Sequence, residues 1–251
     1  MSLIHELVIH FRIGPTDLLR IISTAPIRYK QYTIPKRRGG VRVIAQPSRE
    51  VKAIQRYLLD MKLATFPVHN AATGYVKGQN ILKNAMRHKH NRVILKLDFV
   101  DFFPSIKTRD WDVLLASSKN TVVLKSDSTF YKQLLFWGQG STTPRCLSIG
   151  APTSPAISNI MMFRLDTRLS EIAARMNVIY TRYADDITVS GQRVEDVLRF
   201  ERSLITSIKN TKSPVFTMNN DKRGLYPERP AANGNWTRRY PKWGNINWSG
   251  A

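Results

Sequence analysis

Apolar residues recur along the chain with two periods that alternate. A spacing of three to four residues is typical of an amphipathic helix. It predicts helices in four places: residues 1–25, 51–61, 154–176 and 194–208. The third begins at Ser154-Pro155, a pair typical of a helix start.

Alternating, β-branched runs between these helices predict strands. They lie at residues 92–99, 178–184 and 187–189. Two further extended runs, 32–34 and 41–44, flank the turn Arg38-Gly39-Gly40 and predict a basic β-hairpin. Helices mixed with hairpin-connected strands indicate the α+β class.

The charge points to a polyanionic partner. The 251 residues carry 39 Lys and Arg against 18 Asp and Glu, a net charge of +21, and 42% of them are hydrophobic. That much apolar material builds a core, so the charge lies on a folded protein that attracts nucleic acid or an anionic membrane face. Structural proteins of the ribosomal type share such a charge.

Cysteine and hydropathy exclude several other classes. One cysteine, Cys146, makes no intramolecular disulfide, and the histidines lack zinc-ligand spacing. No apolar run approaches the roughly 18 residues of a membrane span. We therefore expect a cytoplasmic protein with no membrane partner.

Four carboxylates end two of the predicted strands. Asp98 and Asp101 follow one apolar strand, and Asp185-Asp186 separates the strands of a hairpin. Such pairs are common turn residues. In a chain poor in acids, they also fit a hard-cation site, with oxygen ligands that hold two Mg²⁺ ions for phosphoryl transfer.

These motifs resemble bacterial reverse transcriptases. Leu97 to Ser105, Gly150 to Pro155 and Tyr183-Ala184-Asp185-Asp186 occur in the order and spacing of that family. Asn84-Ala85-Met86-Arg87-His88 is similar to the NAxxH element of the retron type, and residues 34–48 strengthen the likeness. The resemblance covers residues 1 to about 226 and implies a right-hand polymerase fold with fingers and palm.

The resemblance implies roles for individual residues. It makes Asp98, Asp185 and Asp186 the metal ligands and Lys222 the acid that protonates pyrophosphate. The remaining positions implied to bind the nucleotide are Arg42 and Lys36 at the β- and γ-phosphates, the backbone of Phe99, the turn Asp101-Phe102-Phe103, the Phe103 ring against the sugar, and Gly150 beside the base pair. Ile149 stands where many members have Gln, which puts nucleotide selectivity in question.

The resemblance also implies partners. These are a structured non-coding RNA template, the RNA–DNA hybrid, dNTP substrates and an effector protein of an antiviral defence system. Alternatives are a reverse transcriptase of the group II intron-like or abortive-infection type, or a non-catalytic RNA-binding remnant.

The expected organisation has three parts. They are an N-terminal helix with fingers (1–92), a palm with part of the fingers (93–226) and an aberrant tail (227–251). Read one nucleotide later, permitted codons for residues 232–251 give QMVTGLVVTPNGEILIGRE, which contains the VTG strand that the family carries there. We therefore expect that a frameshift near Tyr226 replaced the VTG strand and the α-helical thumb, leaving template binding weak.

Overall fold

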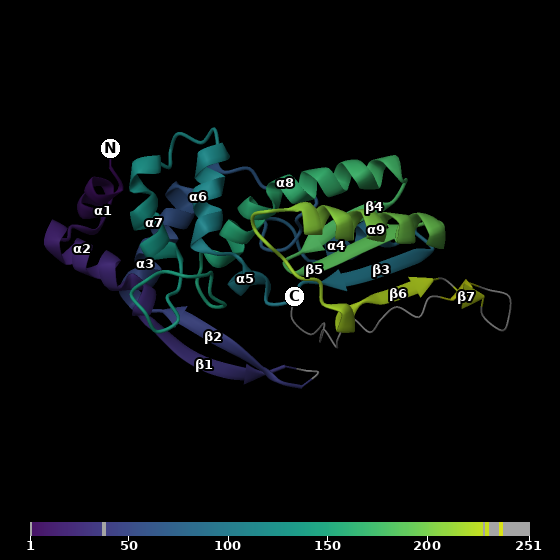
Figure 1. Ribbon diagram of the computed structural model, residues 1–251, viewed down its shortest axis with the longest axis horizontal. Helices are drawn as coiled ribbons and strands as arrows, with labels where there is room; N and C mark the ends of the chain where they lie inside the picture. Colours follow the sequence, from purple (N-terminus) through teal and green to yellow (C-terminus); the bar gives the residue numbers. More distant parts are fainter. Residues whose placement is uncertain (1, 37–38, 228, 231–235, 238–251) are drawn as a thin grey trace. The chain divides into compact units, whose positions relative to one another are not determined.

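The computed structural model describes residues 2–36, 39–227, 229–230 and 236–237 (Figure 1). The chain forms two compact units. Unit 1 comprises Met1–Asn70, Val100–Leu165 and Lys209–Phe216, and unit 2 comprises Ala71–Phe99, Asp166–Ile208 and Thr217–Ala251. The division into fingers and palm at residue 92 stays a prediction.

Unit 1 is mainly helical. Its helices are α1 (Leu3–Phe11), α2 (Pro15–Thr24), α3 (Arg49–Met61), α5 (Phe102–Ser105), α6 (Thr108–Ser117), α7 (Ser128–Leu135) and the first part of α8 (Ser154–Arg175), with short 3₁₀ turns at Ala25–Ile27, Leu63–Thr65 and Lys125–Asp127. The expected single helix over residues 1–25 is two helices. Arg12, with φ of 51°, ends the first, and Pro15 begins the second.

The predicted basic hairpin is confirmed. Strands β1 (Tyr29–Pro35) and β2 (Val41–Pro47) pair antiparallel, with Pro35 opposite Val41. Gly39 and Gly40 in the connecting turn have φ of 89° and 76°, which glycine adopts at little cost. Most of the hairpin is exposed, apart from the end of β2 near Ile44 and Ala45.

Unit 2 contains an antiparallel sheet in the order β4-β5-β3-β6. Its strands are β3 (Val93–Asp98), β4 (Ile179–Tyr183), β5 (Asp186–Gly191) and β6 (Gly224–Pro227), accompanied by α4 (Ile81–His88), the second part of α8, α9 (Val194–Asn210) and a 3₁₀ turn at Asn220–Lys222. The three strands expected from alternation are confirmed, whereas the pattern did not predict β6. The α+β class is confirmed as well.

The two faces of this sheet differ in polarity. Leu95, Leu97, Ile187 and Val189 share one face and are at most 5% exposed. Tyr180, on the same face, lies 5.9 Å from the Phe200 ring of α9, and Figure 1 shows α9 running along the sheet. The other face carries Lys96, Asp98, Asp186 and Thr188, because side chains alternate between the faces.

The tail prediction falls largely outside the described residues. Arg229–Pro230 (β7) and Trp236–Thr237 (β8) form a short antiparallel pair. The other tail residues after Pro227 are not among those described. Within the described part of the chain, no helix combines the length and apolar character that crossing a lipid bilayer requires.

Candidate active site

Two of the predicted metal ligands face each other across the sheet. Asp98 ends β3 and Asp186 begins β5, and the two residues are directly paired in the antiparallel register. Opposite side chains of such a pair lie on the same face, with Cβ atoms about 4.5–5.5 Å apart. Asp185 precedes Asp186 in the turn after β4. The structure therefore brings the three aspartates into one corner of unit 2.

The hairpin turn lies one residue earlier than the pattern predicts. Tyr183 pairs with Asp186, so Ala184 and Asp185 form the turn and Asp186 belongs to β5. Ala184 has φ of 58°, in the left-handed region that non-glycine residues seldom adopt. Asp185 therefore lies in the turn, and Asp186 is the first residue of strand β5.

Asp98 is buried and fully engaged. Its side chain is 4% exposed, and Oδ2 accepts a hydrogen bond from Lys222 Nζ at 2.8 Å. Oδ1 accepts one from Asn219 Nδ2 at 3.3 Å, while the Asn219 backbone N–H donates to the Asp98 carbonyl at 2.8 Å. Lys222 was a candidate from sequence; Asn219 was missed, although it opens the polar run that contains Lys222.

Partial burial and neighbouring carboxylates raise the pKa of Asp186. Partial removal from water, together with the carboxylates of Asp185 and Asp98, raises the pKa of Asp186 to about 6. Lys96 and Lys222 act in the opposite direction. The corner thus holds more negative charge than its ammonium groups offset.

This donor set fits a divalent cation. Its oxygen ligands are those that Mg²⁺ prefers, and a cation would relieve the mutual repulsion of the carboxylates. Among the described residues, no three His, Cys, Asp or Glu side chains are already arranged as metal ligands. Lys222 bonds directly to Asp98 and occupies a coordination direction there.

His88, a buried histidine at the end of α4, connects the strands β4 and β5. Nδ1 of His88 lies 2.7 Å from Ser190 Oγ, and Nε2 lies 2.7 Å from Thr181 Oγ1. Burial, followed by the charges of Arg87 and Lys96, lowers the pKa of His88 to about 4. The ring is therefore neutral near pH 7 and links β4 to β5, so it belongs to the support of the hairpin.

The remaining predicted residues, apart from Phe99, lie in unit 1. Lys36 and Arg42 are exposed on the β1–β2 hairpin and have no ion-pair partner among the described residues. Gly150 has φ of 124°, and a Cβ there would lie 2.9 Å from the Ala45 carbonyl oxygen. Gly150 is therefore packed against β2.

The segment after Asp98 contains both buried and open side chains. Phe99, in unit 2, is 2% exposed and forms an isolated β-bridge with Met218. In unit 1, Asp101 is exposed with φ of 44°, and its carbonyl accepts from the Ser105 N–H at 2.8 Å. Phe102 is buried against Phe216, with ring centres 5.4 Å apart, whereas Phe103 is half-buried. Of these rings, Phe103 is the more open to a ligand.

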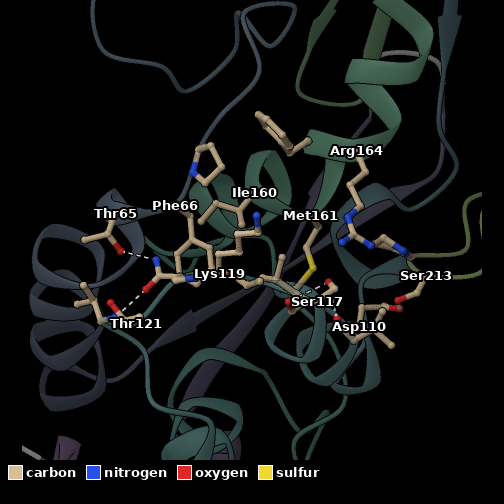
Figure 2. A pocket seen from close by; sticks show the side chains of 18 residues that line it. Thr65, Phe66, Asp110, Ser117, Lys119, Thr121, Ile160, Met161, Arg164 and Ser213 are labelled. Atoms are coloured by element: carbon tan, nitrogen blue, oxygen red, sulfur yellow. Dashed lines mark hydrogen bonds between the residues drawn. The ribbon is translucent and has the colours of Figure 1, made fainter.

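A cavity of about 620 Å³ lies elsewhere in unit 1 (Figure 2). Apolar side chains such as Phe66, Ile160 and Met161 line it, with Lys119 and Arg164 among the polar ones. It contains none of the residues that the sequence singled out. We therefore place the candidate active site at the aspartates of unit 2.

The comparisons with known proteins define the class. Residues 34–229 match the family described as reverse transcriptase (RNA-dependent DNA polymerase). The chain belongs to the reverse transcriptase family, and the resemblance inferred from its motifs is confirmed.

Its relatives are of the retron type. The chain is 41% identical over 188 residues to the retron Mx162 reverse transcriptase of Myxococcus xanthus, covering 70% of this chain and 38% of that protein. It is 42% identical over 178 residues to the retron Ec83 reverse transcriptase of Escherichia coli, covering 70% and 56%. In each case the match spans less than two thirds of the relative.

Solved structures with the same fold are more distant in sequence. Apo telomerase of Candida tropicalis, truncated from the C-terminal domain, has a TM-score of 0.53 at 13% identity, covering 85% of this chain and 52% of that one. Telomerase of Candida albicans in complex with a TWJ fragment of telomeric RNA also has a TM-score of 0.53 at 13% identity, covering 81% and 42%. These structures support the fold alone.

Proposed function

We propose that this chain carries the catalytic core of a retron-type RNA-directed DNA polymerase that joins dNTPs on a structured RNA template. Asp98, Asp185 and Asp186 hold two Mg²⁺ ions in this proposal. The observation that carries it is the direct pairing of Asp98 with Asp186 across β3 and β5, with Asp185 in the adjoining turn.

Each residue of the corner has a defined task. Bound Mg²⁺ would polarise the α-phosphate and favour the deprotonated form of the attacking hydroxyl. Asp98 and Asp185 would be the principal ligands of the ions, and Asp186 would add a third carboxylate. Lys222 is positioned beside Asp98, where its ammonium group donates a proton to departing pyrophosphate.

In this proposal, residues of unit 1 bind the nucleotide substrate. Arg42 and Lys36 neutralise the β- and γ-phosphates, a role that suits exposed cations without ion-pair partners in the described part of the chain. The Asp101 turn and Phe103 bind the nucleotide and exclude the 2′-hydroxyl of a ribonucleotide.

The partners follow from the charge and from the resemblance of the motifs. A net charge of +21 supports binding of an RNA template and of the RNA–DNA hybrid, with affinity that falls as salt rises. An effector protein of a defence system is the further partner that the resemblance of the motifs to the retron type implies, and we include it in the proposal.

Primer extension on a primed RNA template tests the proposal. We expect dNTP incorporation that requires Mg²⁺, and a loss of about 100-fold or more in Asp98→Asn and in Asp185→Asn/Asp186→Asn, since a lost oxygen ligand removes stabilisation of the transition state. Asp60→Asn is the matched control, because Asp60 is an exposed carboxylate on α3.

The outcomes separate the alternatives. Extension by wild type and Asp60→Asn, but not by the site variants, supports the polymerase. Equal RNA binding by all variants without extension by any of them supports the RNA-binding remnant instead.

A further inference from the structure

A charged pair lies in the core of unit 2, directly behind the catalytic turn. Arg182 of β4 and Asp166 of α8 are both 0% exposed. Arg182 Nη2 donates to Asp166 Oδ2 at 2.7 Å, and Nε donates to Oδ1 at 3.1 Å. Tyr180 Oη donates to Asp166 Oδ1 at 2.7 Å. The carboxylate is therefore held by three hydrogen bonds.

The third nitrogen of the guanidinium, Nη1, bonds to the turn itself. Arg182 Nη1 donates to the Ala184 carbonyl at 2.9 Å, and that carbonyl belongs to the peptide bond that begins Asp185. Because the guanidinium is planar and rigid, fixing two of its nitrogens on Asp166 also fixes the third. The position of the Asp185 backbone is thus tied to α8.

A second segment, residues 71–74, holds the same turn through backbone hydrogen bonds and close packing. The Arg182 N–H donates to the Ala71 carbonyl at 2.8 Å, and the Thr73 N–H donates to the Arg182 carbonyl at 2.8 Å. A Cβ at Gly74 would lie 2.7 Å from the Ala184 nitrogen, so this segment packs directly on the turn. Together these contacts hold Ala184 in its left-handed conformation.

Stability alone does not explain why a protein keeps a buried ion pair at this position. Removing two charges from water is costly, and a well-packed apolar pair of similar volume is often at least as stable. An apolar pair could not donate a hydrogen bond to the Ala184 carbonyl. The arrangement therefore suits control of geometry at the turn.

We propose that Arg182, oriented by Asp166, is a positioning residue that sets the Ala184–Asp185 turn so that Asp185 and Asp186 hold divalent cations. This inference rests on the proposed function for the role of the aspartates. The claim that Arg182 fixes the turn does not depend on the proposed function, and hydrogen exchange tests it separately.

Two kinds of variant separate positioning from folding. Arg182→Lys keeps the charge but lacks the planar group whose three nitrogens bond Asp166 twice and the Ala184 carbonyl once. The triple variant Arg182→Met/Asp166→Leu/Tyr180→Phe removes the whole network and leaves no buried charge in its place. Arg193→Lys is the matched control, since Arg193 is an exposed arginine that forms an ion pair with Asp196. Circular dichroism and thermal unfolding select the variants that fold.

The first readout is hydrogen exchange of the full chain without metal or nucleic acid. In folded Arg182 variants, we expect faster exchange in peptides that cover residues 183–187 and unchanged exchange in the β1–β2 hairpin. Wild-type exchange at the turn in a folded variant would overturn the inference, whatever the activity.

The second readout is Mn²⁺ binding, measured by electron paramagnetic resonance. We expect the folded Arg182 variants to bind Mn²⁺ at least ten-fold more weakly, and to lose kcat with little change in KM for dNTP. Faster exchange with wild-type Mn²⁺ affinity and kcat would overturn the link to the metal.

The two proposals fail in different ways. If wild type binds no Mn²⁺ and extends no primer, the proposed function fails and, with it, the link to the metal, while hydrogen exchange still decides whether Arg182 fixes the turn. If wild type is active and Arg193→Lys and Arg182→Lys behave alike in every assay, only the inference about Arg182 fails.

Discussion

Asp98 and Asp186 are direct partners across β3 and β5, so two carboxylates share one face of the sheet at its polar end. Like charges placed opposite each other destabilise a sheet. Here Lys222, 2.8 Å from Asp98 Oδ2, offsets part of this repulsion. A divalent cation held by Asp98, as proposed above, would therefore compete with Lys222 for the same carboxylate.

This competition makes a prediction for Lys222→Gln. Without the ammonium group, Asp98 is free to bind a cation, and we expect the chain without nucleotide to bind Mn²⁺ about three-fold more tightly, a change of roughly 0.6 kcal/mol. Lys222→Arg keeps a positively charged side chain beside Asp98, so its Mn²⁺ affinity should resemble that of wild type. Weaker Mn²⁺ binding by Lys222→Gln, measured by electron paramagnetic resonance, would contradict the competition.

His88 predicts a dependence of stability on pH. Its pKa is about 4 in the folded protein and about 6.5 in an unfolded chain, so the unfolded chain binds the proton first as pH falls. His88 therefore makes its full contribution to the free energy of unfolding above about pH 6.5. This contribution declines by about 2–3 kcal/mol as the pH falls toward 4.

Urea unfolding at pH 7 and at pH 4.5 measures this effect. His88→Gln should be less stable at pH 7, because it replaces the bridge between Ser190 and Thr181, and it should lose less stability on acidification. His90→Gln, at an exposed histidine two residues away, is the control and should keep the wild-type difference. Equal pH dependence in His88→Gln and wild type would exclude His88 as the source.

The elements that carry the aspartates could be predicted from sequence, because alternation marks strands and acids at their ends mark a polar edge. The contact between Asp98 and Lys222 could not, since 124 positions separate them. Strand β6 escaped prediction because its four residues begin with Gly224 and end with Pro227, which are typical of turns. Arg182 was missed because an arginine in a strand is expected at the surface. Its burial depends on Asp166, which lies on another element.

The reading-frame hypothesis for the tail is tested by the gene. We expect that codons 232–251, read one nucleotide later, encode the VTG segment and that this frame stays open beyond it. Resequencing of the gene from codon 220 onward provides the measurement. A shifted frame that does not encode the VTG segment, or that meets a stop codon directly after it, would contradict the hypothesis.

Gly150 and Gly40 form a matched pair for the last prediction, because both have positive φ but different surroundings. A Cβ at Gly150 would lie 2.9 Å from the Ala45 carbonyl oxygen, whereas a Cβ at Gly40 would meet nothing within 4 Å. Gly40→Ala should therefore cost only the backbone strain, about 1–2 kcal/mol. Gly150 has φ of 124°, further from the left-handed helical region than Gly40, and Gly150→Ala also adds a clash with backbone, so we expect a further loss of about 1–3 kcal/mol. Chemical denaturation of both variants measures the difference, and equal losses would show that β2 yields to the added methyl group.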